Sequence, residues 1–194
     1  MLQRLTKYGE KVLKETAEKI EAFDDSVKSL ARDLTETLYA ENGLGLAAPQ
    51  IGVSRRMFVI DMRKRANADI SCDFTIDGKT LPLDIAMPLV AINPEVEEIG
   101  EYVTIAEEGC LSFPEIFAEV ERSDMVIMRY FDIDGAPHEL VCEGLFSRCV
   151  QHESDHLDGI CFIDRMRSKE LFKIDGKLRK LRKQTREFLK SESK

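Results

Sequence analysis

Two histidines and a glutamate in the second half of the chain have the spacing of a metal-dependent hydrolase. The stretch from His152 to His156, HESDH, matches the pattern H-E-x-x-H. On a helix, residues four apart share one face, so both imidazoles can hold one cation. Glu153 lies about a hundred degrees further round such a helix, where its carboxylate can reach a water molecule held by the ion. The pattern therefore predicts a metal site with a separate group that moves protons.

A third protein ligand is expected, and the sequence offers several candidates. His138 lies in an expected hairpin. Glutamates also follow the motif, but in a strongly charged tail where exposure is expected; they are Glu170, Glu187 and Glu192. Cys110 is the stronger candidate, because a thiolate binds borderline and soft ions well. A single cysteine is more often a small buried apolar residue, so this choice is a hypothesis.

A loop rich in small residues, Gly43 to Gln50 (GLGLAAPQ), could contact a substrate. Its glycines and alanines leave the backbone accessible, so a peptide could lie against it and exchange main-chain hydrogen bonds. Gln50 offers an uncharged amide donor, which suits a developing negative oxygen. Small residues also mark tight packing. A phosphate-binding loop is not indicated, since no Lys-Ser or Lys-Thr pair follows the glycines.

The elements that must position these residues are short strands and a few helices. Helices are expected at 24–42, at 144–156, which carries the H-E-x-x-H residues, and from Lys177 onward. Apolar runs bounded by turn residues predict strands; they lie at 57–60, 89–92, 125–133 and 138–142. The polar stretch 63–84 indicates a long excursion or irregular hairpin. Because strands and helices do not alternate regularly, we predict an α+β fold, with antiparallel sheets around a central metal-binding helix and a C-terminal helix.

Length and composition favour one cytoplasmic domain over residues 1–194. The chain is 43% hydrophobic and 33% charged, as in ordinary globular domains. No stretch approaches the roughly 20 apolar residues that span a bilayer, so no membrane association is expected. The five cysteines have no spacing typical of a small disulfide-bonded protein. We therefore expect reduced thiols. A monomer is also expected.

Charge is distributed unevenly along the chain. Residues 165–194 contain twelve Lys and Arg against four Asp and Glu, a net charge of +8, which leaves −16 for residues 1–164. A basic helical tail on an acidic body predicts either a polyanionic partner or a solvated helix without one.

Three segments together resemble the signature motifs of bacterial peptide deformylases, in the same order. Residues 43–50 resemble G-x-G-x-A-A-x-Q, residues 108–112 resemble E-G-C-L-S, and residues 151–156 resemble Q-H-E-x-D-H. The resemblance implies a metallohydrolase that removes the formyl group from N-formylmethionyl nascent peptides. Residues 63–87 form a longer insertion than in compact members of the family, and the tail varies among members.

The resemblance also implies a role for each matching residue. Cys110, His152 and His156 would hold one divalent metal ion per chain, Fe(II) in the cell, with zinc, nickel or cobalt as alternatives. Glu153 would be the general acid and base, and Gln50 with the N–H of Leu111 would stabilise the oxyanion. Further substrate contacts are expected from the backbone of Gly45 and Gly109, and from a methionine pocket formed by Leu44, Leu145, Cys149 and the aliphatic part of Arg148.

Two other classes of function fit part of the pattern. A zinc endopeptidase of the H-E-x-x-H type would need a glutamate or histidine as third ligand. A non-catalytic metal- or peptide-binding module would not need Glu153. For a deformylase, which acts on nascent chains, the ribosome is the polyanionic partner expected for the basic tail.

Overall fold

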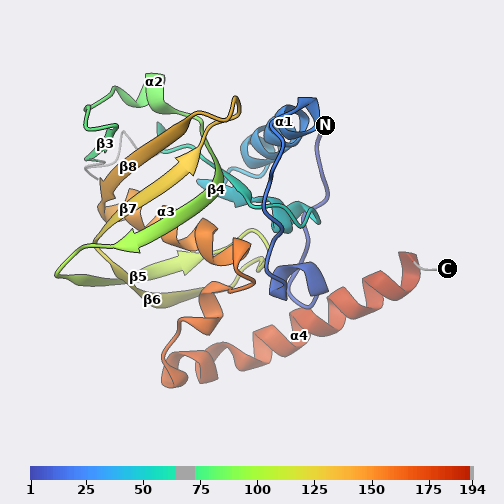
Figure 1. The fold of residues 1–194 in the computed structure, drawn as a ribbon. Coiled ribbons are helices and arrows are strands. Elements are labelled where there is room, and N and C mark those ends of the chain that lie inside the picture. The colour runs from blue at the N-terminus through green and yellow to red at the C-terminus, as the bar shows by residue number, and fades with distance from the viewer. Residues whose placement is uncertain (64–72, 193–194) are drawn as a thin grey trace.

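A six-stranded antiparallel sheet wraps round the central helix in the computed structural model, which describes residues 1–63 and 73–192 (Figure 1). Its strand order is β1-β2-β4-β7-β8-β3. The strands are β1 (Gly45–Ala47), β2 (Met57–Ile60), β3 (Phe74–Ile76), β4 (Leu89–Glu98), β7 (Met125–Phe131) and β8 (Pro137–Glu143). The predicted α+β class is confirmed.

A separate hairpin of two strands, β5 (Val103–Gly109) and β6 (Phe117–Ser123), forms the second sheet. The two strands pair antiparallel along their full length, from Val103 opposite Ser123 to Gly109 opposite Phe117. The sequence analysis did not predict this hairpin. Six of the seven residues of β5 are exposed, so it lacks the half-buried apolar face by which a strand is recognised.

Strand β2 contributes to two hydrophobic cores, one on each side of the sheet. All four of its residues are buried, and alternate residues face opposite sides. Phe58 and Ile60 belong to a cluster with α3 (Gly144–Leu157), and Met57 and Val59 to one with α1 (Asp25–Ala40). The sheet is therefore covered by α3 on one side and by α1 on the other.

Side-chain capping and left-handed backbone positions set the ends of helices α1 and α3. The side chain of Asp24 accepts hydrogen bonds from the N–H groups of Ser26 and Val27, which caps α1. After α1 the chain turns at Asn42, whose φ is +57°, and enters the glycine loop. Helix α3 begins at Gly144, whose φ of +60° lies in the left-handed region that favours glycine. Two short helical turns, η1 (Lys11–Lys14) and η2 (Ala48–Ile51), lie near the site.

Helix α4 (Ser168–Glu192) runs beneath the body, and its last turns extend past the N-terminal segment (Figure 1). Its buried residues are Ile174, Leu178, Leu181 and Thr185. Ile174, Leu178 and Leu181 pack in a third cluster with Phe113 and Phe162. The expected tail helix is thus present, but it starts nine residues before Lys177. Phe188, further along the helix, is 41% exposed.

Two other expectations need correction. The run at 89–92 does not stop at Asn93; strand β4 continues to Glu98 through a bulge between Ile92 and Glu95, where Asn93 has a φ of +49°. Of the expected excursion at 63–84, residues 64–72 lie outside the described residues. Beyond them, β3 pairs with β8, and α2 (Leu83–Ala86) follows. Among the described residues, no helix has the length and apolar character to cross a membrane.

Candidate metal centre

The predicted metal ligands come from two elements that meet at the end of the small sheet. Helix α3 carries His152 and His156 one turn apart, and Cys110 follows directly after β5. One ligand atom from each of the three residues lies within 4.8 Å of the others. Cys110 Sγ lies 3.3 Å from His156 Nε2. The structure therefore brings together the cysteine and both histidines as one candidate ligand set, as the sequence predicted.

The surroundings of these residues fit a cation. Burial holds the pKa of His156 well below its ordinary value, so its ring is neutral, as a metal ligand must be. Burial alone would also lower the pKa of His152, but the sulfur of Cys110 and the carboxylate of Glu108 raise it well above its ordinary value. The raised pKa of His152 shows that the sulfur and the carboxylate favour positive charge at this ring, and a divalent ion bound there would supply that charge in place of the proton.

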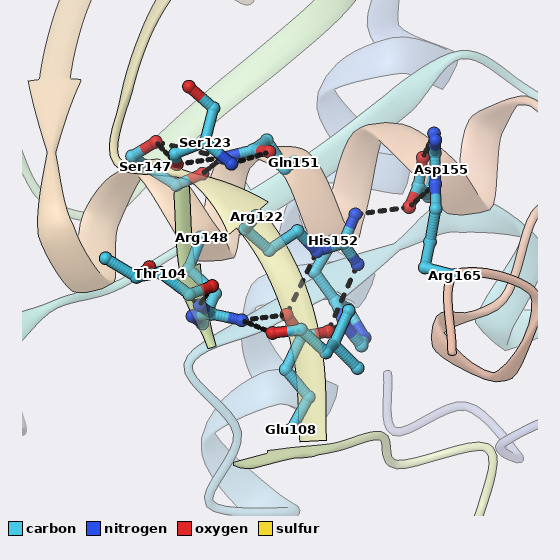
Figure 2. Close-up of polar contacts among 11 residues, drawn as sticks. Thr104, Glu108, Arg122, Ser123, Ser147, Arg148, Gln151, His152, Asp155 and Arg165 are labelled. Atoms are coloured by element: carbon cyan, nitrogen blue, oxygen red, sulfur yellow. Dashed lines mark hydrogen bonds and ion pairs between the residues drawn. The ribbon is translucent and has the colours of Figure 1, made fainter. Parts of the chain in front are cut away.

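A buried charge network holds His152 in place (Figure 2). Glu108 Oε2 lies 2.9 Å from His152 Nδ1, which leaves Nε2 of that ring available to a metal. The same carboxylate accepts hydrogen bonds from Arg122, at 3.0 and 3.1 Å, and from Arg148, at 2.8 Å. Arg122 also donates to Asp155 at 2.5 Å. Burial opposes ionisation of Glu108, but hydrogen bonds from His152 and Arg122 keep its pKa well below the usual range.

The same network joins the small sheet to α3. Arg148 on α3 donates to the backbone and hydroxyl oxygens of Thr104 on β5, at 2.8 and 2.9 Å. Gln151 and Ser147 both donate to the carbonyl of Ser123 at the end of β6, at 2.8 and 3.0 Å. These hydrogen bonds hold the hairpin, whose first strand ends beside Cys110, against the helix that carries His152 and His156.

Glu153 differs from the other acidic residues of the site in its hydrogen bonding. It is 3% exposed, and its Oε2 has no hydrogen-bond partner among the described residues. Burial raises the pKa of Glu153 to about 7. A Cβ atom at Gly45 would collide with its carboxylate, so the glycine of the first motif leaves room for this side chain.

The first motif lies beside the ligands. Gln50 is buried, and its Nε2 donates to Cys110 Sγ at 3.3 Å, while its Oε1 accepts the N–H of Ala47 at 2.7 Å. One cleft, with a volume of about 650 Å³, is lined by every predicted site residue except His156. Within it, the guanidinium of Arg148 is engaged with Glu108, so only its aliphatic part can serve an apolar pocket.

Sequence reasoning missed several residues of the site. Glu108, Gln151 and Asp155 belong to the matched motifs, which was a signal that they had a role. Arg122 has no such signal, because its partners are far away in the sequence. Lys7, Phe117 and Glu115 also line the cleft and were not singled out.

A family model described as polypeptide deformylase matches residues 2–172. The chain belongs to the peptide deformylase family. Membership confirms the predicted activity, the metal-dependent removal of the N-formyl group from nascent peptides. It decides against the endopeptidase and the non-catalytic binding module, and the Cys110, His152 and His156 set is the metal site typical of a deformylase.

Named relatives and solved structures agree with deformylase membership. A peptide deformylase from Opitutus terrae is 44% identical over 187 residues, which cover 96% of each chain. One from Novosphingobium aromaticivorans is 42% identical over 173 residues, 88% of this chain and 92% of the other. The crystal structure of the Thermotoga maritima deformylase has a TM-score of 0.72 at 38% identity, covering 86% of this chain and 99% of that one.

Proposed function

We propose that Glu153 moves the proton during hydrolysis of N-formylmethionyl peptides at a metal held by Cys110, His152 and His156. The observation that supports this role is the buried Glu153 oxygen without a partner, next to the ligand set. When bound, a divalent ion supplies Lewis-acid polarisation and lowers the pKa of a bound water. Release of formate from formyl-Met peptides is the direct test, and absence of that release would contradict the proposal.

The proposed proton path runs through one carboxylate. Glu153 accepts a proton from the attacking water, whose oxygen bonds to the formyl carbon. It then gives that proton to the leaving nitrogen as the C–N bond breaks, and formate departs. A pKa near neutrality suits a group that must both accept and donate a proton.

The remaining residues of the cleft bind and orient the substrate in this proposal. The Gln50 amide and the Leu111 N–H stabilise the negative oxygen, and loss of one such donor typically costs about 2.7–4 kcal/mol of transition-state stabilisation. The backbone of Gly45 and Gly109 pairs with the peptide. The methionine side chain enters the pocket formed by Leu44, Leu145, Cys149 and the stem of Arg148, all of which line the cleft.

We propose ferrous iron as the working metal, with zinc, nickel or cobalt as substitutes. The iron enzyme is expected to lose activity in air, because ferrous iron and the Cys110 thiolate are both oxidisable. Activity is followed over time in air and under anaerobic conditions, with the zinc- or nickel-loaded protein as control. Equal lifetimes of the iron enzyme under the two conditions would contradict iron as the working metal.

We also propose one catalytic domain that acts as a monomer in the cytoplasm. Cys110 and Cys161 are free thiols, which supports a reducing compartment. Clusters of buried residues link α1, α3 and α4 to the sheets, which supports a single folding unit.

We propose that α4 binds the ribosome through its exposed basic face. Lys177, Lys180, Lys183 and Arg186 are exposed, while Leu178 and Leu181 are buried. Substitution of the four basic residues by glutamine, which keeps the buried seam, is expected to reduce ribosome co-sedimentation at low salt, because fewer phosphates are neutralised. Hydrolysis of short formyl-Met peptides is expected to stay within about twofold, since no proposed catalytic group lies on α4.

The matched control replaces four exposed basic residues outside α4, which are Lys11, Lys19, Arg32 and Lys79. It removes the same charge and should retain ribosome binding. The proposal fails if the unmodified protein shows no salt-sensitive binding to ribosomes.

A further inference from the structure

A three-residue segment near the N-terminus, Thr6 to Tyr8, is hydrogen-bonded to both loops that carry the proposed oxyanion donors. The N–H of Thr6 donates to the Gln50 carbonyl at 2.8 Å, and its hydroxyl donates to the Pro49 carbonyl at 3.0 Å. The N–H of Tyr8 donates to the Ser112 carbonyl at 3.0 Å. One segment therefore fixes the distance between the first motif and the cysteine motif.

Lys7, in the middle of this segment, contacts Leu111 directly. Its Nζ donates to the Leu111 carbonyl at 2.9 Å, and its side chain lines the cleft. On the other side of Leu111, the N–H of Phe113 donates to the Cys110 carbonyl at 2.8 Å. That carbonyl shares a planar peptide group with the Leu111 N–H. Both peptide groups that flank Leu111 are therefore held by hydrogen bonds, and Lys7 supplies one of them.

The segment that carries Lys7 is itself well anchored. The Lys7 N–H donates to Glu10 at 2.7 Å. Glu10 is buried, and its carboxylate accepts two hydrogen bonds from Arg4, at 2.8 and 2.7 Å. The ring of Tyr8 stacks on that of Phe113, with 4.9 Å between centroids. A well-anchored segment of the chain therefore holds the Lys7 ammonium beside the Leu111 carbonyl.

The placement of Lys7 is unfavourable for a lysine with no role. Burial lowers the pKa of Lys7, and the hydrogen-bond partner of its ammonium is a neutral carbonyl. A neutral acceptor compensates the lost hydration of a cation less well than a carboxylate does. Charged groups kept in such places cluster at functional sites.

We propose that Lys7 is a positioning residue for deformylation, whose hydrogen bond to the Leu111 carbonyl keeps the Leu111 N–H aimed at the developing negative oxygen. The inference rests on the oxyanion role proposed above for Gln50 and Leu111. Lys7 acts through a peptide group, so its loss slows the chemical step more than it weakens substrate binding.

The test compares Lys7→Met, which keeps the chain length without a donor, with Lys7→Arg, which keeps a cationic donor. Lys11→Met is the matched control, because Lys11 is exposed and pairs with Glu15, outside the cleft. For Lys7→Met we expect kcat to fall about 10- to 100-fold, less than complete loss of an oxyanion donor. KM should stay within about twofold, metal content should be unchanged, and Lys7→Arg should recover most of kcat.

Hydrogen exchange supplies a readout that does not depend on activity. The amides of residues 109–113 should exchange faster in Lys7→Met, and residues of α3 should not. Wild-type kcat in a folded Lys7→Met protein overturns the inference, as does an equal loss in Lys7→Arg. If Lys7→Met does not fold, the same comparison with Lys7→Gln decides.

Gln50→Ala separates this inference from the function on which it rests. If Gln50→Ala keeps full kcat, the oxyanion role itself is wrong. If Gln50→Ala is slow and Lys7→Met is not, only the role of Lys7 is wrong.

Discussion

Replacing Glu153 by glutamine is expected to lower turnover by about 10²–10⁴-fold, the usual effect of losing a general acid and base. Glutamine has nearly the same shape, so it fits the space that Gly45 leaves, but it cannot accept a proton. Metal content should stay at one ion per chain, because Glu153 is not among the three ligands. Formate release under saturating substrate and metal analysis of the same preparation measure both effects.

The pH profile adds an independent check. The reaction needs the Glu153 carboxylate unprotonated at the start, so the rate should rise with pH through its pKa, and this acid limb should disappear in the variant. Glu119→Gln is the control, since Glu119 is exposed on β6. A Glu153→Gln protein that deformylates at the normal rate would show that another group moves the proton.

Replacing Cys110 by serine is expected to remove most of the metal and, with it, most of the activity. A hydroxyl stays protonated at neutral pH and is a poor substitute for a thiolate ligand. Loss of an outer-shell partner alone weakens metal binding about 10- to 100-fold, so loss of a direct ligand should exceed that range. Metal content after dialysis and activity on formyl-Met peptides are the measurements.

Other cysteines provide the controls for this substitution. Cys142 and Cys161 are buried but do not belong to the ligand set. Cys142→Ser and Cys161→Ser are therefore expected to keep the metal, even if burial of a hydroxyl lowers their melting temperatures. Full metal occupancy in Cys110→Ser would be incompatible with the proposed ligand role.

The residues that could be predicted from the sequence are those whose function depends on local spacing. The interval between His152 and His156 predicts a shared face on any helix, and the structure has that helix. The strands of the large sheet were likewise predictable where apolar runs end at turn residues, as at β2 and in the β7–β8 hairpin.

What the sequence could not predict depends on contacts between distant segments. Arg122 gains its role only when β6 places it between Glu108 and Asp155. Lys7 meets Leu111 across 104 positions of the chain. Strand β5 exposes six of its seven residues, apolar Val103 and Ile105 as well as Glu107, so no buried apolar face marks it as a strand.

The buried network around Glu108 also constrains how this protein can change over time. Arg122 and Arg148 both pair with Glu108, and Arg122 pairs with Asp155 as well. Substitution of Glu108, for example, leaves Arg148 buried without this carboxylate, and breaking a buried ion pair typically costs about 3–5 kcal/mol. Replacement of the whole set by apolar residues carries no such penalty, but it requires several coordinated substitutions. Evolution away from this network therefore passes through less stable proteins. We expect substitutions at these positions to be rare and to occur together.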